Sequence, residues 1–522
     1  MDADAPRPPR RSLKVKIKVL HSDFSSTILN ARSRGKPSQH DPRDSNAAAS
    51  IRPPQPEDTM PKEIVLNAFD MNCVGHIQQG MWTHPRDQST RYTDLQYWTD
   101  YARTLEAGLF DGIFFADVAG VYDVYGGNAD AALRGAVQVP VNDPTLLIPA
   151  MAAVTRHLSF GVTSNLTVEQ PYLFARRMST LDHLTRGRVG WNIVTGYLDS
   201  ASRAIGLTGQ MAHDDRYDLA DEYMELVYKL WECSWDDGAV LRDKVQGVYA
   251  DASKVHVIHH HGKQYRVDAM HLSEPSPQRT PVLYQAGSSA RGKRFAAAHA
   301  ECVFVNGQAR PAVKAIVDDI RAHAVAGGRH ADDIKVLLGQ TVITGRTDNE
   351  AQEKYAEYRR YVSSEAALVH AAASLGIDFA RYDLDEPIET GKSQAIVSNV
   401  EAMTRAAGPQ WTKRKLLEQM MLGSRQAPLV GSAERVASEL IAWTEEAGVD
   451  GFNLSRTVAP ECFEDFVAHV VPILQERGAY KRAYREGTLR EKLFGHARLP
   501  SSHTAAKFRS PACAAAPIPG NA

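Results

Sequence analysis

Residues 95–116, LQYWTDYARTLEAGLFDGIFFA, contain the pattern that decides the fold class. Apolar residues recur in the first part at spacings of 3, 4, 3 and 4, at positions Leu95, Trp98, Ala102, Leu105 and Leu109. This spacing is typical of a helix with one buried face. Asp111-Gly112 ends the helix, and the run Ile113–Ala116 is apolar throughout, as expected for a parallel strand covered on both faces. The segment therefore predicts a helix that leads into a buried strand.

The same alternation continues along the chain in both directions. Strands are predicted at residues 62–69, 113–116, 158–165, 188–194, 282–286, 302–306, 335–344 and 451–454. Further helices are predicted at residues 145–156, 173–184 and 291–300, and Ser432 and Gly448 are the expected caps of a last helix. About eight such units, over roughly 400 residues, suit a closed (β/α)8 barrel with insertions or an open doubly wound sheet. The pattern by itself leaves both α/β architectures open.

Composition divides the chain into three parts. Residues 1–59 are rich in proline and basic residues and poor in apolar ones, which predicts a disordered N-terminal extension. They contain no uninterrupted apolar region of the kind that a secretory signal needs, and Met60 is an alternative biological start. Residues 60–495 form the predicted barrel. Residues 496–522 are rich in Ala, Ser and Pro, which predicts a disordered tail.

Charge and cysteine content exclude several classes of protein. Lys and Arg number 60 against 62 Asp and Glu, a net charge of -2 that does not attract nucleic acid. The longest uncharged stretches, such as residues 144–155, are shorter than the roughly 20 residues that span a membrane. The 5 cysteines contain no CxxC pair, which argues against a disulfide framework or a cysteine-rich zinc site. A cytoplasmic protein is therefore expected.

Candidate site residues follow the predicted strands, because ligands of α/β proteins bind beyond the carboxyl ends of parallel strands. They are Asn72, Cys73, His76, Asp117, Thr163, Ser164, Asn165, Asn192, Thr195 and the run Gly287-Ser288-Ser289. Each alone is more often structural, since Asp, Asn and Ser cap helices and close turns at such positions. Their gathering at one end of the sheet favours a binding site.

The most informative single segment is residues 285–292, QAGSSARG. A strand end, a glycine, two hydroxyls and a helix start follow one another, and this arrangement can hold a phosphate with N–H and O–H donors. The alternative is a helix N-cap by Ser288 or Ser289. No GxGxxG motif is present, and Gly391-Lys392-Ser393 lacks the first glycine of a P-loop, so ATP hydrolysis is not supported.

Two histidine groups were considered as ligands. His213 and Tyr217 are four residues apart at a helix start, so they share a face and can point at one anionic or aromatic ligand, although surface helix starts are often polar in this way. The histidines of the insertion 234–276 lack the helical HxxxH or HExxH spacing. No metal site is predicted.

The chain from about residue 60 to 495 resembles the bacterial luciferase-like flavin monooxygenases. The resemblance rests on IVLNAFDMNCVGHIQQGMWTHP at 64–85, GIFFADVAGVYDVYGG at 112–127, GRVGWNIVTG at 187–196, residues 212–231, residues 273–296 and residues 429–454. It implies a (β/α)8 TIM barrel, reduced FMN as a diffusible co-substrate and O2. It also implies a separate NAD(P)H-dependent flavin reductase as partner, and a homo-oligomer.

The resemblance also assigns residues to the flavin. Asp117 and Thr163 correspond to contacts of the flavin ring, His213 and Tyr217 to a His-x-x-x-Tyr pair, and Ser288 and Ser289 to the phosphate loop. His76 corresponds to a histidine near the reacting edge of the ring. As a histidine with an ordinary pKa of about 6.5, His76 is the expected proton donor, and simple packing beside Trp82 is the alternative.

The implied reaction is oxygenation through a flavin C4a-hydroperoxide, shielded from water by a cover over the barrel mouth. The insertions 234–276 and 363–422 are the expected cover. Within the family, the motifs are most similar to those of members acting on a small organosulfur substrate of the dimethyl sulfide type. The alternatives are a polyaminocarboxylate or aryl sulfone as substrate, with Arg134, Arg176 and Arg177 as candidate carboxylate ligands, and an enzyme that degrades the flavin itself.

Overall fold

The computed structural model describes residues 63–287, 289–388, 411–420, 422–423 and 427–509. Internal contacts divide the chain into Met1–Thr59 and Met60–Ala522. The predicted extension 1–59, Ser288 and the Gly391-Lys392-Ser393 segment lie outside the described residues. In the described part, no helix is both long and apolar enough to cross a lipid bilayer.

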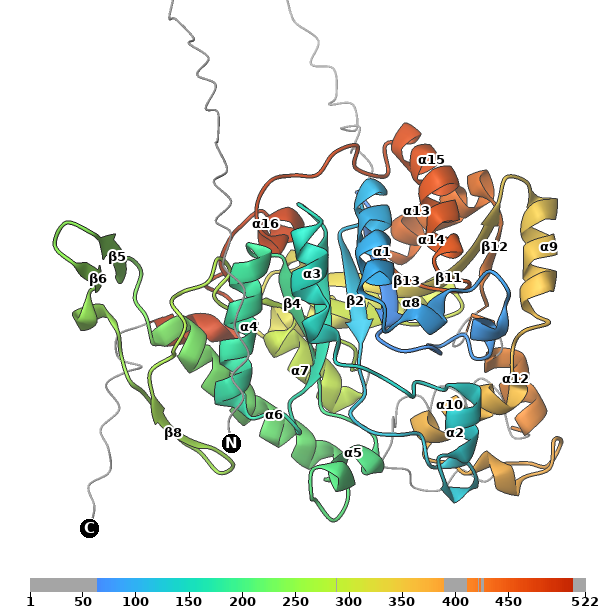
Figure 1. Cartoon of the computed structure of the whole chain (residues 1–522), viewed down its shortest axis with the longest axis horizontal. Coiled ribbons are helices and arrows are strands. Elements are labelled where there is room, and N and C mark those ends of the chain that lie inside the picture. Colours follow the sequence, from blue (N-terminus) through green and yellow to red (C-terminus); the bar gives the residue numbers. More distant parts are fainter. Residues whose placement is uncertain (1–62, 288, 389–410, 421, 424–426, 510–522) are drawn as a thin grey trace, which may run out of the picture. The chain divides into compact units, whose positions relative to one another are not determined.

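Eight parallel strands form a closed barrel (Figure 1). In order around the barrel they are β1 (Val65–Met71), β2 (Gly112–Ala116), β3 (Ser159–Asn165), β4 (Val189–Val194), β9 (Val282–Gln285), β10 (Cys302–Val305), β11 (Lys335–Gly345) and β13 (Gly451–Ser455). Pairing of β10 with β11, and of β13 with both β11 and β1, completes the circle. The predicted TIM barrel is confirmed, and each strand lies where the apolar runs placed it.

Helices follow the strands and cover the barrel. They are α1 (Leu95–Ala107), α2 (Asp130–Gly135), α3 (Ile148–Ala153), α4 (Pro171–Thr185), α5 (Asp199–Ala204), α6 (His213–Tyr228), α7 (Ala290–His299), α8 (Arg310–Ala326), α9 (Asp348–Tyr358), α10 (Ser364–Leu375), α12 (Lys413–Met420), α13 (Ala433–Ala447), α14 (Glu461–Asp465), α15 (Val471–Glu476) and α16 (Leu489–Phe494). The Ser432 side chain accepts a hydrogen bond from the Arg435 N–H, and Gly448 ends α13 with φ of 72°. Both predicted caps of α13 are therefore confirmed.

The apolar stripe that predicted α1 is buried only in its middle. Trp98, Ala102 and Leu105 are buried against the barrel. Leu95 is 54% exposed, because it stands at the first position of the helix, before the helix meets the sheet. Leu109 lies past the end of the helix, in a left-handed conformation with φ of 59°.

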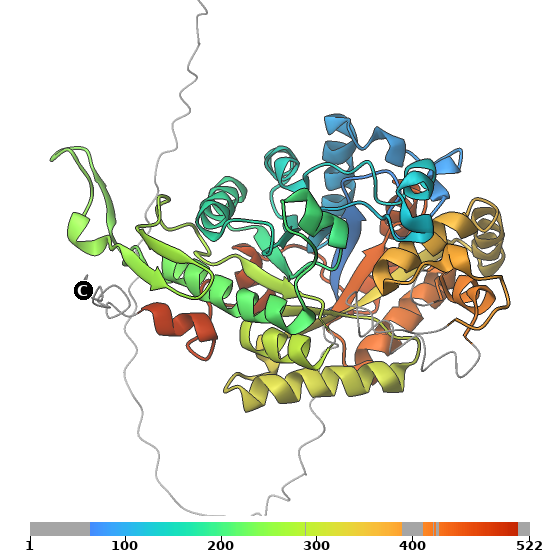
Figure 2. The ribbon, with the colours of Figure 1, turned by 90° about the horizontal axis from the view of Figure 1, so that it is seen from below.

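The two insertions occupy different places. Residues 234–276 form the hairpins β5 (Val240–Asp243) with β6 (Val248–Ala250) and β7 (Ile258–His261) with β8 (Arg266–Ala269). Hydrogen bonds from Gln264 and Tyr265 to Glu222 hold β7 and β8 against the outer side of α6, and the β5–β6 hairpin projects away from the barrel (Figures 1 and 2). The expectation that this insertion covers the barrel mouth is wrong.

The second insertion lies on the loops at the carboxyl ends of β1 and β2. In α10, Ala366, Val369 and Ala373 pack with Ala132 and Val137 of the α2 region. The backbone N–H of Ser363 donates to the carbonyl of Gln79, in the loop after β1. The described part of this insertion thus packs on these loops, and its role as a cover over the barrel mouth stays a prediction. The strand β12 (Leu429–Ser432) pairs in parallel with the carboxyl-terminal part of β11.

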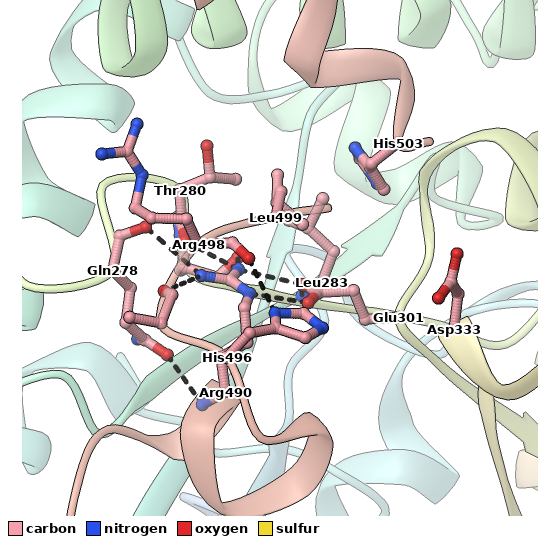
Figure 3. Close-up of polar contacts among 12 residues, drawn as sticks. Gln278, Thr280, Leu283, Glu301, Asp333, Arg490, His496, Arg498, Leu499 and His503 are labelled. Carbon is pink, nitrogen blue, oxygen red and sulfur yellow. Dashed lines mark hydrogen bonds and ion pairs between the residues drawn. The ribbon is translucent and has the colours of Figure 1, made fainter. Parts of the chain in front are cut away.

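The chain remains packed beyond residue 495, where the disordered tail was predicted to begin. Arg490 of α16 is fully buried between Gln278 and Glu301 (Figure 3). Farther on, Arg498 and Arg509 each donate to Oε2 of the buried Glu232, at 3.0 and 2.8 Å. The boundary at 495 is wrong for residues 496–509, because a buried carboxylate at the end of α6 needs these cations despite the Ala- and Ser-rich composition. Residues 510–522 lie outside the described residues.

Ending the chain at residue 495 should destabilise the protein. Glu232 then loses both arginine partners, and leaving one charge of a buried pair without its partner costs about 3–5 kcal/mol. Urea unfolding of the two truncated proteins measures this change. A chain ending at Arg509 is the control and should unfold as the full chain does, and equal stability of both truncations would contradict the role given to the two arginines.

Candidate functional site

A cavity of about 320 Å³ opens at the carboxyl ends of β2, β3 and β4. Its walls come from the loops after these strands and from the starts of α4 and α5. The predicted residues Asp117 and Thr163 both line it, together with Asp143, Glu169 and Tyr197. No residue of the insertion 234–276 takes part. The position matches the face where ligands of (β/α)8 barrels bind.

Asp117 is the most perturbed carboxyl group of this cavity. Its pKa is raised to about 7, chiefly by burial and then by the neighbouring Asp143, with a smaller contribution from Glu169, while a hydrogen bond from the Val118 N–H opposes the rise. Near neutral pH this carboxyl is therefore protonated about half of the time. It can accept a hydrogen bond from a ligand N–H or donate one to a ligand carbonyl.

Buried polar atoms without partners lie on the wall of the cavity, at Ser164, and behind it, at Asn192, which bonds to the lining residue Thr163. Thr163 Oγ1 accepts a hydrogen bond of 2.9 Å from Asn192 Nδ2. Asn192 Oδ1 and the hydroxyl of Ser164 are buried and have no hydrogen-bond partner in the described structure. Buried polar groups are normally paired, so these atoms indicate a polar ligand. The carbonyl and N–H groups along the edge of a flavin ring fit this requirement.

The residues predicted to hold a phosphate converge one strand away. Ser289 caps α7 by accepting a hydrogen bond from the Gly292 N–H, and its Oγ lies 3.4 Å from His213 Nε2. The rings of His213 and Tyr217 are 5.2 Å apart. The N-cap interpretation of Ser289 is confirmed. Phosphate binding stays a prediction that this cap is compatible with, since a helix N-terminus is also where the helix dipole favours an anion.

The tyrosine hydroxyl explains the glycines of this loop. A Cβ atom on Gly287 or on Gly292 would lie 2.8 Å from the hydroxyl oxygen of Tyr217. Burial raises the pKa of Tyr217, so its hydroxyl stays protonated and can donate to a phosphate. Arg291, which follows the loop, is engaged by Asp218 and Asp221, with its guanidinium 5.5 Å from the Tyr217 ring.

The cavity and the predicted phosphate loop lie on the same rim of the barrel, on either side of β4, because β4 pairs with both β3 and β9. In the barrel, Thr163 is opposite Asn192, and Asn192 is opposite Tyr284, three residues before Gly287. The ends of β3 and β9 are therefore two strand spacings apart, or about 10 Å. An elongated ligand with a ring at one end and a phosphate at the other can span them, as FMN does.

His76 lies outside the cavity wall and is buried. Its ring packs edge-on against Phe69, with centroids 4.7 Å apart, and its Nδ1 has no hydrogen-bond partner in the described structure. Burial, the guanidinium of Arg456 and His370 together hold its pKa well below 6.5. The ring is therefore neutral at pH 7. The expectation of a histidine with an ordinary pKa is wrong, although a neutral imidazole still donates and accepts hydrogen bonds.

Asp70 and Arg456 are not among the residues predicted from the sequence, yet they form a buried pair beside His76. Arg456 Nε pairs with Asp70 Oδ1 at 2.8 Å, both side chains are buried, and Arg456 Nη2 donates to the carbonyls of Cys73 and Val74. The guanidinium thus fixes the loop that carries His76. Arg456 directly follows β13, so the rule that was applied to the other strand ends would have found it.

A second missed group connects the cavity to α10. The Tyr122 hydroxyl donates to Gln138 Oε1 and lies 2.6 Å from the hydroxyl of Tyr197, which lines the cavity. The ring of His370 stacks on Tyr122, with centroids 5.8 Å apart. No local sequence pattern predicts this group, because its four side chains come from four separate segments of the chain.

The histidines of the insertion 234–276 pair with other side chains. His259 and His261 both contact Asp268, His260 contacts Glu222, and His271 contacts Ser179. Across the described residues, no group of three or more His, Cys, Asp or Glu side chains is arranged to hold a metal ion.

Replacing the buried pair, as in the double variant Asp70→Asn with Arg456→Met, should raise the pKa of His76. Arg456 disfavours the imidazolium, so its removal lets the ring protonate at higher pH, while burial keeps the pKa below 6.5. An NMR titration of labelled histidine, assigned with His76→Gln, measures this. Arg477→Met, which breaks a surface pair with Glu434, is the control. A folded double variant with an unchanged titration would disprove the electrostatic role.

Comparison with known proteins gives the family. The model of the luciferase-like monooxygenases matches residues 76–451. Dimethyl-sulfide monooxygenase of Hyphomicrobium sulfonivorans is 51% identical over 453 residues, covering 86% of this chain and 94% of that protein. Long-chain alkane monooxygenase of Geobacillus thermodenitrificans is also 51% identical over 453 residues, covering 86% and 99%. The crystal structure of a riboflavin lyase with modified FMN and riboflavin is 39% identical, with a TM-score of 0.81 over 86% of this chain and 100% of that one. The chain therefore belongs to the luciferase-like monooxygenase family and is an FMNH2-dependent oxidoreductase.

Proposed function

We propose that this protein is the oxygenase of a two-component system that oxygenates a small organosulfur compound of the dimethyl sulfide type. A separate NAD(P)H-dependent flavin reductase supplies the reduced FMN. The observation that carries the proposal is a small cavity lined by carboxylates that adjoins a phosphate loop at the barrel mouth. The expected cytoplasmic location and homo-oligomeric assembly stay predictions.

The chain's own residues hold and orient the cofactor. Ser289, Tyr217 and His213 bind the phosphate, with Ser288 as a further predicted contact, and Asp117 and Thr163 contact the ring. When bound, reduced FMN supplies two electrons and activates O2. The balance for dimethyl sulfide is one sulfide, one O2 and one FMNH2 giving methanethiol, formaldehyde, FMN and water. His76, as a neutral ring, contributes a hydrogen bond at the reacting edge, and α10 helps to exclude water.

Cavity size favours a small substrate. About 320 Å³ is near the lower end of the range of about 300–1,000 Å³ for small-molecule sites, and the flavin ring takes part of it. Three heavy atoms can contribute at most about 4.5 kcal/mol of binding, so a substrate like dimethyl sulfide must be selected by volume. A long alkane or a fused-ring sulfone needs more room.

Cavity charge disfavours a polyaminocarboxylate. Asp117, Asp143 and Glu169 line the cavity, and Arg177 is paired with Glu169 at 2.7 Å. Of the other arginines considered for carboxylate binding, Arg134 is exposed and paired with Glu365, and Arg176 is exposed on α4. A tricarboxylate would meet like charges here, which are unfavourable in a buried site.

Assignment of the phosphate loop is tested by Ser289→Asp. Aspartate also caps helices, so α7 keeps its cap, but its charge repels the phosphate. Affinity for oxidised FMN should fall by at least about tenfold, while affinity for riboflavin, which has no phosphate, should change little. Tyr217→Phe should weaken FMN binding in the same selective way. Fluorescence quenching measures the affinity for both ligands, and Ser438→Ala on α13 is the control. An equal loss of affinity for FMN and for riboflavin would show that this loop does not bind the phosphate.

Substrate class is tested in one reaction mixture that contains a flavin reductase, NADH, FMN and ¹⁸O₂. With dimethyl sulfide we expect formaldehyde and methanethiol in equal amounts, one O2 consumed for each, with all FMN recovered. A long-chain alkane supplied in its place should give little alcohol. Preferred alkane oxidation would identify the second candidate substrate, and consumption of FMN would identify a flavin-degrading enzyme. Hydrogen peroxide as the only product, with both substrates, would contradict the proposal.

A further inference from the structure

A second cavity, of about 200 Å³, lies at the opposite end of the barrel. Its walls include Asp111, Lys335 and Asp450, which stand at or just before the starts of β2, β11 and β13. The C-terminal segment, with Lys481 and Lys492, closes the other side. The cavity is therefore separate from the flavin site, which lies beyond the carboxyl ends of the strands.

The carboxylates of this cavity are already engaged. Asp111 Oδ2 accepts hydrogen bonds of 2.8 Å from the backbone N–H of Leu66 and from Lys481. Asp450 Oδ2 accepts one of 2.8 Å from the Val336 N–H, and its other oxygen lies 3.7 Å from Lys335. Both acids are thus fixed by the barrel backbone, and each has one lysine of the cavity as a partner.

Lys492 is the cavity cation on which the acids Asp111, Glu486 and Glu106 act only from beyond ion-pair distance. Its Nζ donates to the carbonyl of His157 at 2.9 Å and lies 5.5 Å from the centre of the Tyr484 ring, and it forms no ion pair among the described residues. Burial and the nearby Arg188 lower its pKa to about 8. An ammonium group has three donors, so at least one further donor can serve a ligand in the cavity.

The balance of charge in the cavity is positive. The walls contain four cations and three carboxylates: Lys335, Lys481, Arg485 and Lys492, and Glu63, Asp111 and Asp450. Arg485 pairs with Glu63, and both of these side chains are exposed. We propose that this cavity is a binding site for a small tetrahedral oxyanion, phosphate or sulfate, held by the ammonium group of Lys492 with Lys481 and Lys335 beside it. The physical reason is that a half-buried ammonium without a counter-ion gains most from a charge-assisted hydrogen bond.

The test uses the full chain saturated with oxidised FMN, so that the flavin phosphate loop is occupied. Lysine side chains are acetylated with a limiting reagent at pH 8, and the modification of Lys492 is followed by peptide mass spectrometry. Inorganic phosphate and sulfate are compared with sodium chloride at equal ionic strength. A bound oxyanion keeps Lys492 protonated, and only the neutral amine reacts, so both oxyanions should slow its acetylation by about tenfold. Lys314, which pairs with Asp318 on the surface of α8, is the internal control and should not respond.

A second measurement separates this site from any other. Calorimetric titration of Lys492→Met with phosphate should show at least about tenfold weaker binding than the original protein, whereas Lys492→Arg should retain it. Equal acetylation rates of Lys492 in phosphate and in chloride would overturn the proposal. So would an unchanged phosphate affinity in a folded Lys492→Met protein. Phosphate binding that differs from sulfate binding would identify which of the two oxyanions the cavity prefers.

Discussion

Closure of the parallel barrel is the constraint on which every functional feature depends. Pairing of β13 with β1 and of β10 with β11 closes the circle of eight strands, and because every pairing in it is parallel, the strands run in the same direction around one axis. All carboxyl ends then meet at one rim. Loops that are far apart in the sequence are thereby brought within contact distance, and both the cavity and the phosphate loop are products of that rim.

Electrostatics divide the rim into two halves. The proposed phosphate loop combines a helix N-terminus, hydroxyl donors and Tyr217, all of which favour an anion. The neighbouring cavity has the opposite character, with Asp117, Asp143 and Glu169 around it. A ligand with an anionic tail and a neutral ring therefore has only one favourable orientation across β4. Negative charge on this wall disfavours an anionic ligand in the cavity.

Buried charges away from the cavity support this arrangement from three sides. Arg456 and Asp70 fix the loop of His76, and Arg490 and Glu301 join α16 to the base of the barrel (Figure 3). Arg498 and Arg509 neutralise Glu232 at the end of α6, the helix whose start carries His213 and Tyr217. Single buried charges are costly, so each of these groups requires its partner in place. The C-terminal segment is in this way linked to the helix that carries half of the phosphate site.

Much of the fold and part of the site could be predicted from the sequence because they depend on local pattern. Strand and helix periodicity, the caps Ser432 and Gly448, and polar residues at strand ends are all read within a few positions of one another. Asp117, Thr163, His213, Tyr217 and Ser289 were found in this way and lie on one rim. The prediction of a disordered tail was wrong for residues 496–509 because it was based on composition alone. Composition does not show that Arg498 and Arg509 pair with the buried Glu232.

What the sequence by itself determined is the order of strands and helices and the identity of the groups at the strand ends. Only the tertiary structure decided the state of those groups and their partners. Distant segments meet in the ion pair of Arg456 with Asp70 and in the hydrogen bond between the hydroxyls of Tyr122 and Tyr197. They also form the surroundings that keep His76 neutral and that lower the pKa of Lys492. Their charge and protonation depend on burial and on neighbours that only barrel closure brings together, and no local periodicity records such neighbours.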